Sequence, residues 1–138
     1  KRMNEYPLTS LVTLALVLLG VLLANRVSSA RLEFSQSDQP SVTQHSIEIY
    51  SDPKFMIVFR NQMNLLEHLI LFLPTLWIFA FGLSDGLAAV VGLGYFTGRV
   101  LYARSYPHSH KVGYTLAWLS MLVLMIGAFA SSIYQLVT

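Results

Sequence analysis

A run without a single charged side chain, LTSLVTLALVLLGVLLA at residues 8–24, constrains the possible folds of this sequence more than any other feature. A helix of that length rises about 26 Å, close to the thickness of the hydrocarbon core of a bilayer. Residues 112–138 form a second stretch without charge. Only 12% of the 138 residues are charged and 54% are hydrophobic, whereas about a quarter of the residues in soluble domains are charged. The bilayer is therefore the expected solvent.

Four apolar segments of helical length predict an all-α integral membrane protein, a four-helix bundle in which residues 1–138 form a single transmembrane domain. The expected helices cover residues 7–30, 53–82, 87–105 and 112–136. Residues 28–30, Ser-Ser-Ala, weakly resemble the cleavage site of a secretory signal. The apolar run is longer than an ordinary signal core, and Asn25-Arg26 interrupts it before that site, so we expect a resident helix.

Residues 31–52 are polar and are expected to form a long loop outside the membrane. Ile47 and Ile49 alternate with polar neighbours, which allows a short strand. Most basic residues lie on the side of the loops between helices one and two and between helices three and four: Arg26, Arg31, Lys54, Arg60, Arg99, Arg104 and Lys111. Only Lys1 and Arg2 lie on the side of the termini. The positive-inside rule therefore predicts that both loops are cytoplasmic.

Composition also limits the chemistry. The sequence has no cysteine, so it cannot form a disulfide, a thiolate metal site or a cysteine nucleophile. Its net charge is only +2, and the basic residues are scattered rather than clustered. We therefore expect no nucleic-acid partner. His108 and His110 share a short turn, but two histidines alone are weak evidence for a metal site.

Two polar stripes run along the second and third expected helices. Arg60, Asn64 and Glu67 are spaced at i, i+4 and i+7, so they share one helix face, with His68 at its edge. The third helix repeats this spacing with Tyr95, Arg99, Tyr102 and Tyr106. An ionisable group at the centre of a spanning helix costs about 2.5–3.5 kcal/mol, so such groups normally face a bundle interior or a wet cavity. The two stripes are candidates for one shared site.

Within such a site, Arg99 can neutralise Glu67 and leave Arg60 free for an anionic ligand, because a guanidinium binds carboxylates bidentately. Two simpler interpretations stay open. The charged side chains can snorkel or pair near the interface, and the tyrosines can form an interfacial aromatic belt. Gly94 and Gly98 form a small-xxx-small pair, which favours close helix packing over ligand contact.

Two segments resemble the MAPEG family, the membrane-associated proteins of eicosanoid and glutathione metabolism: FMIVFRNQMNLLEHLILFLPTLW at 55–77 and GLGYFTGRVLYARSY at 92–106. The family's R-x-Q-x-N-x-x-E signature is matched by Arg60, Gln62, Asn64 and Glu67. Its third-helix pattern is matched by Gly98-Arg99, Tyr102 and Tyr106. Together with the helix count and the long first loop, the resemblance covers nearly the whole chain.

The resemblance implies a homotrimer that binds glutathione between neighbouring protomers near the cytoplasmic face. The carboxylates of glutathione would meet Arg60 and other bases, while Asn64 and Glu67 would hold its peptide groups or its amino group. The remaining ligand contacts that it implies are Arg31, Gln62, His68, Arg99, Tyr102 and Tyr106. The expected activity is that of a glutathione S-transferase, which conjugates lipophilic substrates arriving through the bilayer and also reduces lipid hydroperoxides. The expected location is a bacterial inner membrane.

Activation of the thiol is where the sequence departs from the family. Eicosanoid-synthesising members have an arginine at the start of helix four, and this sequence has Gly113 at that position. We expect Lys111 or Tyr102 to stabilise the thiolate instead, although lysine is a flexible point charge rather than a planar fork. Leukotriene-forming members often have a second arginine after the position of Arg31, where this chain has Leu32. Leukotriene synthesis is therefore not expected.

Two other functions remain open at this point. Four helices and an intramembrane Glu67 are also what a small proton-coupled multidrug transporter needs. Such carriers tend to place their acid in helix one, which is uncharged here over residues 8–24. A catalytically inactive family member is the other alternative, and it is favoured by Gly113.

Overall fold

The structure is a computed structural model that describes residues 5–36 and 47–138. Lys1, Arg2 and residues 37–46 of the predicted loop lie outside the described residues. The described chain consists of α1 (Pro7–Ser35), η2 (Ile47–Ser51), α2 (Pro53–Gly82), α3 (Asp85–Ser105) and α4 (Lys111–Val137). All four α-helices are long and apolar enough to cross a membrane. The prediction of an all-α chain with four helices of membrane-spanning length is therefore confirmed for the described residues.

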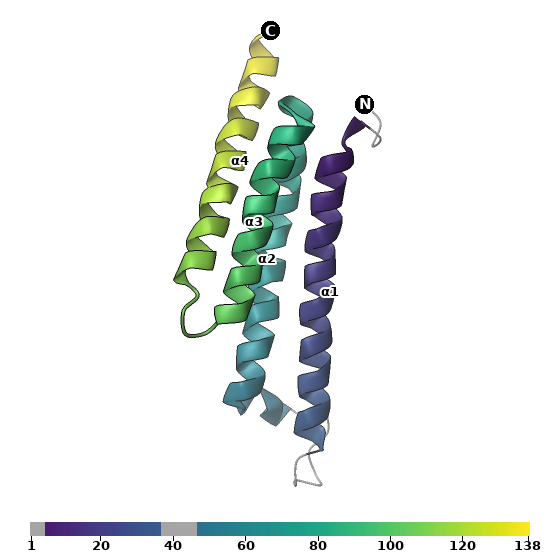
Figure 1. The fold of residues 1–138 in the computed structure, drawn as a ribbon, viewed down its shortest axis with the longest axis vertical. Coiled ribbons are helices and arrows are strands. Elements are labelled where there is room, and N and C mark those ends of the chain that lie inside the picture. The colour runs from purple at the N-terminus through teal and green to yellow at the C-terminus, as the bar shows by residue number, and fades with distance from the viewer. Residues whose placement is uncertain (1–4, 37–46) are drawn as a thin grey trace.

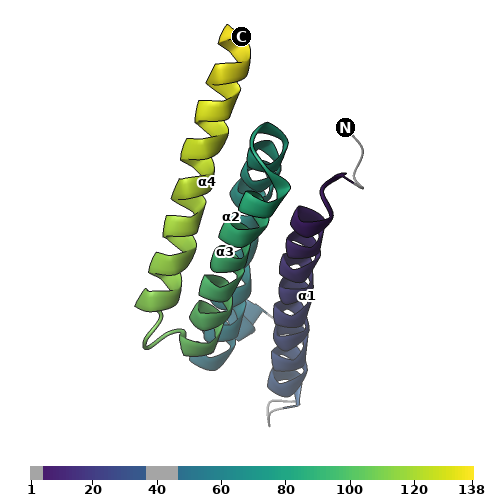
Figure 2. The same cartoon turned by 45° about the horizontal axis from the view of Figure 1, so that its top comes forward.

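The four helices run side by side along the long axis of the molecule, and the start of α1 lies at the same end of it as the end of α4 (Figure 1). α2 and α3 occupy the middle, with α1 on one flank and α4 on the other (Figure 2). The main apolar core includes Leu16 of α1, Phe72 and Leu76 of α2 and Leu124 of α4, all of which are fully buried. The outward faces are rich in exposed leucine, isoleucine and valine, as expected for helices surrounded by lipid.

The described part of the loop after α1 differs from the prediction. Residues 47–51 form a 3₁₀ helix, so the prediction of a short strand at Ile47 and Ile49 was wrong. Ile49 is fully buried in a second apolar cluster with Val27 and Phe55. The 3₁₀ turn directs the Ile49 side chain into this cluster. α1 continues to Ser35, past the predicted end at residue 30, because Phe34 also packs against this cluster.

Capping side chains set the starts of α2 and α3. The Asp52 carboxylate accepts a hydrogen bond from the backbone of Lys54 at 2.9 Å, and Pro53 occupies the first turn. The Ser84 hydroxyl accepts one from the backbone of Leu87 at 3.4 Å, so α3 begins at Asp85 rather than at residue 87. The Asp85 carboxylate in turn accepts hydrogen bonds from backbone N–H groups of Leu8 and Thr9, at 3.1 and 2.8 Å. It thereby ties the start of α3 to the start of α1.

Candidate functional site

Asn64 and Arg99 join the two polar stripes. Arg99 of α3 is only 2% exposed, and its Nη1 donates a hydrogen bond to Oδ1 of Asn64 on α2 at 2.9 Å. The guanidinium also lies 4.9 Å from the centre of the Tyr102 ring, a cation–π distance. Beside this contact, Nδ2 of Asn61 donates to the carbonyl of Ala103 at 3.0 Å. These contacts hold the first half of α2 against the second half of α3.

An aromatic group continues from this pair to the start of α4. The rings of Tyr102 and Tyr106 are stacked with centres 5.4 Å apart, and the His110 ring lies 5.4 Å from Tyr102 and 5.7 Å from Tyr106. A ring nitrogen of His110 is held by the Pro107 carbonyl at 2.9 Å. Tyr102, His110 and Lys111 also line an open pocket of about 290 Å³, together with Tyr114 and Thr115. The predicted catalytic pair, Lys111 and Tyr102, therefore borders one pocket.

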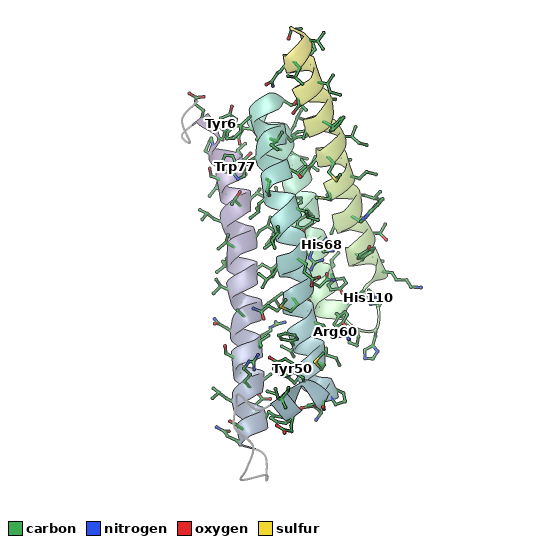
Figure 3. All side chains as sticks on the ribbon, turned by 180° about the vertical axis from the view of Figure 1, so that it is seen from behind. Tyr6, Tyr50, Arg60, His68, Trp77 and His110 are labelled. Carbon is green, nitrogen blue, oxygen red and sulfur yellow. The ribbon has the colours of Figure 1, made fainter. Side chains whose placement is uncertain are left out.

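The two charged residues of the α2 signature lie elsewhere. Arg60 and Glu67 are exposed, on a face of α2 whose other exposed side chains include Met63 and Ile70. Arg99 is directed at Asn64 and does not neutralise Glu67 in the described structure, in contrast to the arrangement considered from sequence. His68 is half-buried and interacts electrostatically with both Arg99 and Glu67. Figure 3 labels Arg60 and His68 along α2 and His110 at the start of α4.

Arg31 belongs to a separate group at the end of the bundle. Its Nη2 donates to the Tyr50 hydroxyl at 3.1 Å, and its guanidinium lies 5.1 Å from the centre of the Phe55 ring. Tyr50 lies beyond Arg60 toward the lower end of the molecule (Figure 3). Gln62 is half-buried on α2. The predicted ligand contacts thus fall into three groups within one chain: the Asn64–Arg99–Tyr102 cluster, the exposed face of α2, and the Arg31 group.

The structure explains why position 113 is occupied by glycine. Gly113 is buried against α3, and a Cβ placed on it would overlap the backbone nitrogen of Tyr102. A Cβ on Gly98 would lie 2.6 Å from the backbone nitrogen of Ala117. The start of α4 therefore packs backbone to backbone against α3. Position 113 has no room for a side chain that reaches the pocket, whereas Lys111 is exposed at its edge.

Sequence reasoning missed two residues of this region. The pair His108 and His110 suggested only a weak metal site, although His110 lies four residues after Tyr106 and immediately before Lys111. Its aromatic contacts place it inside the tyrosine group. Asn61 lies between two signature residues, and its buried position shows that one face of the signature helix serves packing. A helical wheel would have placed Asn61 on the apolar side with Leu65, which is the signal that could have identified it.

Comparison with known proteins agrees with the family resemblance seen in the sequence. The sequence model of the MAPEG family matches residues 9–131. An uncharacterized protein of Synechocystis sp. is 34% identical over 130 residues, which is 92% of this chain and 89% of that protein. Leukotriene C4 synthase of Mus musculus is 35% identical over 123 residues, 89% of this chain and 77% of that enzyme. Microsomal glutathione S-transferase 2 of Homo sapiens is 33% identical over 103 residues, 75% of this chain and 65% of that enzyme.

Proposed function

Because this chain belongs to the MAPEG family, we propose that it is a membrane-bound glutathione transferase, which conjugates glutathione with hydrophobic electrophiles. The observation that supports the proposal best is the cluster of Asn64, Arg99 and Tyr102 beside the pocket of Lys111. Relatives named as a leukotriene C4 synthase and as a microsomal glutathione S-transferase match most of this chain. Leukotriene synthesis itself is not part of the proposal, because Leu32 and Gly113 replace two arginines.

Glutathione offers two carboxylates, an amino group, two amides and a thiol, and the site residues offer matching groups. Arg60 would bind a carboxylate and Glu67 the amino group, since both project from one exposed face of α2. Amide and hydroxyl groups would hold the rest of the peptide. The further contacts we propose are Arg31, Gln62, Asn64, His68, Arg99, Tyr102 and Tyr106. Arg99 acts chiefly by fixing Asn64, because it is buried and already hydrogen-bonded to that residue.

The exposed charges support a homotrimer whose sites are completed between protomers. Glu67 lies between Leu65 and Leu69, which belong to the main core, and immediately before the apolar second half of α2. At the bilayer centre, a carboxylate that faces lipid costs about 2.5–3.5 kcal/mol. A neighbouring protomer against this face would remove that cost. It would also bring the separate Arg31 group of another chain within reach of the same ligand.

The chemical step needs a thiolate. The Lys111 ammonium at the pocket edge would lower the pKa of the glutathione thiol, and the Tyr102 hydroxyl would donate a hydrogen bond to the sulfur. With a chlorinated nitrobenzene, the thiolate attacks the ring carbon that carries chlorine, a carbon–sulfur bond forms, and chloride leaves. With a lipid hydroperoxide, two glutathione molecules are oxidised to the disulfide while the hydroperoxide is reduced to an alcohol and water.

The placement of the site suits reactants from two phases. Glutathione would arrive from the cytoplasm, where the positive-inside rule favours the connecting loops because basic residues lie near the ends of α1 and α3. The electrophile would arrive laterally through the lipid. In a bacterium, this arrangement corresponds to the inner membrane.

The test is conjugation of 1-chloro-2,4-dinitrobenzene and reduction of a lipid hydroperoxide by purified protein in detergent, with calorimetric measurement of glutathione binding alongside. Both saturable binding and conjugation are expected. Saturable binding without either activity would instead identify a catalytically inactive glutathione-binding member, which the buried Gly113 favours as the second candidate. Absence of both binding and activity would refute the proposal. Family membership leaves the transporter alternative without a supporting observation.

A further inference from the structure

A second cavity lies between α1 and α3, apart from the pocket of Lys111. It is a groove of about 220 Å³, and its walls include Leu18 and Leu22 of α1 and Phe96 and Val100 of α3. Leu18 is 58% exposed and Leu22 is 52% exposed, so the groove is open to the surroundings of the bundle. Apart from two arginines, all of its lining residues are apolar. An apolar groove on an outer face at this depth suits a hydrocarbon chain.

The two arginines define one end of the groove. α1 and α3 run in the same direction (Figure 1), and the last lining residue of each helix is an arginine, Arg26 on α1 and Arg104 on α3. Both guanidinium side chains are exposed. No acidic residue among those described lines the groove. The cavity therefore combines an apolar wall with an uncompensated double positive charge at a single end.

The two arginines lie at the boundary of the apolar region, where the headgroup of a lipid would be found. Arg26 follows immediately after the uncharged run 8–24 and Asn25, and Arg104 lies at the last turn of α3. Both mark the place where the apolar part of their helix ends. Basic pockets between spanning helices at the cytoplasmic boundary are suited to anionic lipid headgroups. Zwitterionic lipids carry the same phosphate together with a balancing cation, so they gain less from two guanidiniums.

We propose that the α1–α3 groove binds one anionic phospholipid, with the phosphate on Arg26 and Arg104 and part of an acyl chain between Leu22 and Val100. The geometry that carries this proposal is the single groove with apolar walls and both arginines at the end where the hydrocarbon region stops. The proposal is independent of transferase activity, since none of these residues belongs to the proposed glutathione site.

The test is native mass spectrometry of the protein in a neutral detergent, titrated with phosphatidylglycerol or with phosphatidylcholine of the same acyl chains. One retained phosphatidylglycerol per chain is expected, with at least tenfold preference over phosphatidylcholine. Arg26→Gln and Arg104→Gln should each reduce that preference several-fold. Lys54→Gln is the matched control, because Lys54 is an exposed cation at the start of α2 that does not line the groove. Leu22→Trp should reduce retention of the lipid by filling the groove.

Two results would overturn the proposal. Equal retention of the two lipids, or losses in Arg26→Gln and Arg104→Gln no larger than in Lys54→Gln, would show that the arginines form no lipid site. The other result concerns a second copy of the chain. Because the sequence has no cysteine, Leu22→Cys provides a unique thiol. Efficient disulfide cross-linking of Leu22→Cys between protomers in membranes would show that protein, rather than lipid, covers the groove.

Discussion

Arg60 and Arg99 have the same chemistry but opposite environments. Arg99 is 2% exposed and hydrogen-bonded to Asn64, while Arg60 projects from the surface of α2. A buried guanidinium that is already engaged fixes the positions of neighbouring groups, whereas an exposed one is free to meet a ligand. At the residue scale, binding of glutathione should therefore respond most directly to Arg60.

We expect Arg60→Ala to weaken glutathione binding by about 1–3 kcal/mol, the usual scale for a lost charge-assisted contact. The measurement is isothermal calorimetry in detergent. Lys54→Ala removes a cation from the first turn of the same helix and should leave the affinity unchanged. An unaltered affinity in Arg60→Ala would remove Arg60 from the site.

Replacement of Lys111 should affect thiol activation rather than binding. Lys111→Met removes the cation at the pocket edge, so the pKa of the thiol of bound glutathione should rise by about 1 unit or more. The thiolate fraction at neutral pH then falls, and the ascending limb of the rate profile moves to higher pH. Measurement of kcat and KM against pH should show lower kcat at neutral pH with little change in KM. A profile that coincides with that of Lys54→Met would assign the activation to another group, with Tyr102 and His110 nearest.

At the scale of elements, the α3–α4 contact determines what the start of α4 can contribute. Gly98 and Gly113 face one another across a backbone contact, and neither position has room for a side chain. Small residues at such crossings allow spanning helices to approach closely. Position 113 therefore has no room for an arginine side chain, and in the proposed function thiol activation falls to Lys111 and Tyr102.

This packing predicts the effect of a single methyl group. Gly113→Ala should destabilise the protein by about 1–3 kcal/mol, since overpacking against backbone cannot be relieved by side-chain rotation. Gly20→Ala is the control, because a Cβ there meets nothing within 4 Å. Thermal denaturation of both variants in one detergent gives the comparison. Gly113→Arg should lower folded yield and fail to raise conjugation. Equal stability of the two alanine variants would contradict the close approach.

The helices could be predicted from sequence because their signals are local. Uncharged runs indicate the spans and Asp52-Pro53 marks the start of α2, whereas the Ser84 cap starts α3 two residues before the predicted boundary. The burial of Ile49 against Val27 and Phe55 depends on residues distant in sequence, so its 3₁₀ turn was mistaken for a strand. Helical spacing grouped Asn64 with Arg60 and Glu67, but in the structure Asn64 contacts Arg99 while the two charged residues are exposed. Helical spacing alone does not predict which side chains turn inward. The Asn64–Arg99 hydrogen bond and the position of His110 therefore follow only from the structure.

At the scale of the whole molecule, the outer surface is not uniformly suited to lipid. Most exposed side chains on α1 and α4 are apolar, whereas α2 exposes Arg60 and Glu67 together with Met63. Lipid solvates the first kind of surface at no cost and the second only with a penalty. We therefore expect the proposed homotrimer to assemble through this face of α2, because such an interface would bury these charges.

The assembly can be tested with a unique thiol, because the sequence has no cysteine. Met63 is 36% exposed on the same face of α2 as Arg60 and Glu67, so Met63→Cys should form disulfide-linked dimers in membranes under mild oxidation. Ile126→Cys is the matched control: it lies on α4, is 62% exposed, and should remain monomeric if that face meets lipid. The native assembly should have the mass of three chains by light scattering in detergent, since a threefold axis brings three copies of one α2 face together. Cross-linking at Ile126 but not at Met63 would place the interface on α4. It would also leave Glu67 facing lipid, and the proposed glutathione site would then lose the neighbouring chain that completes it.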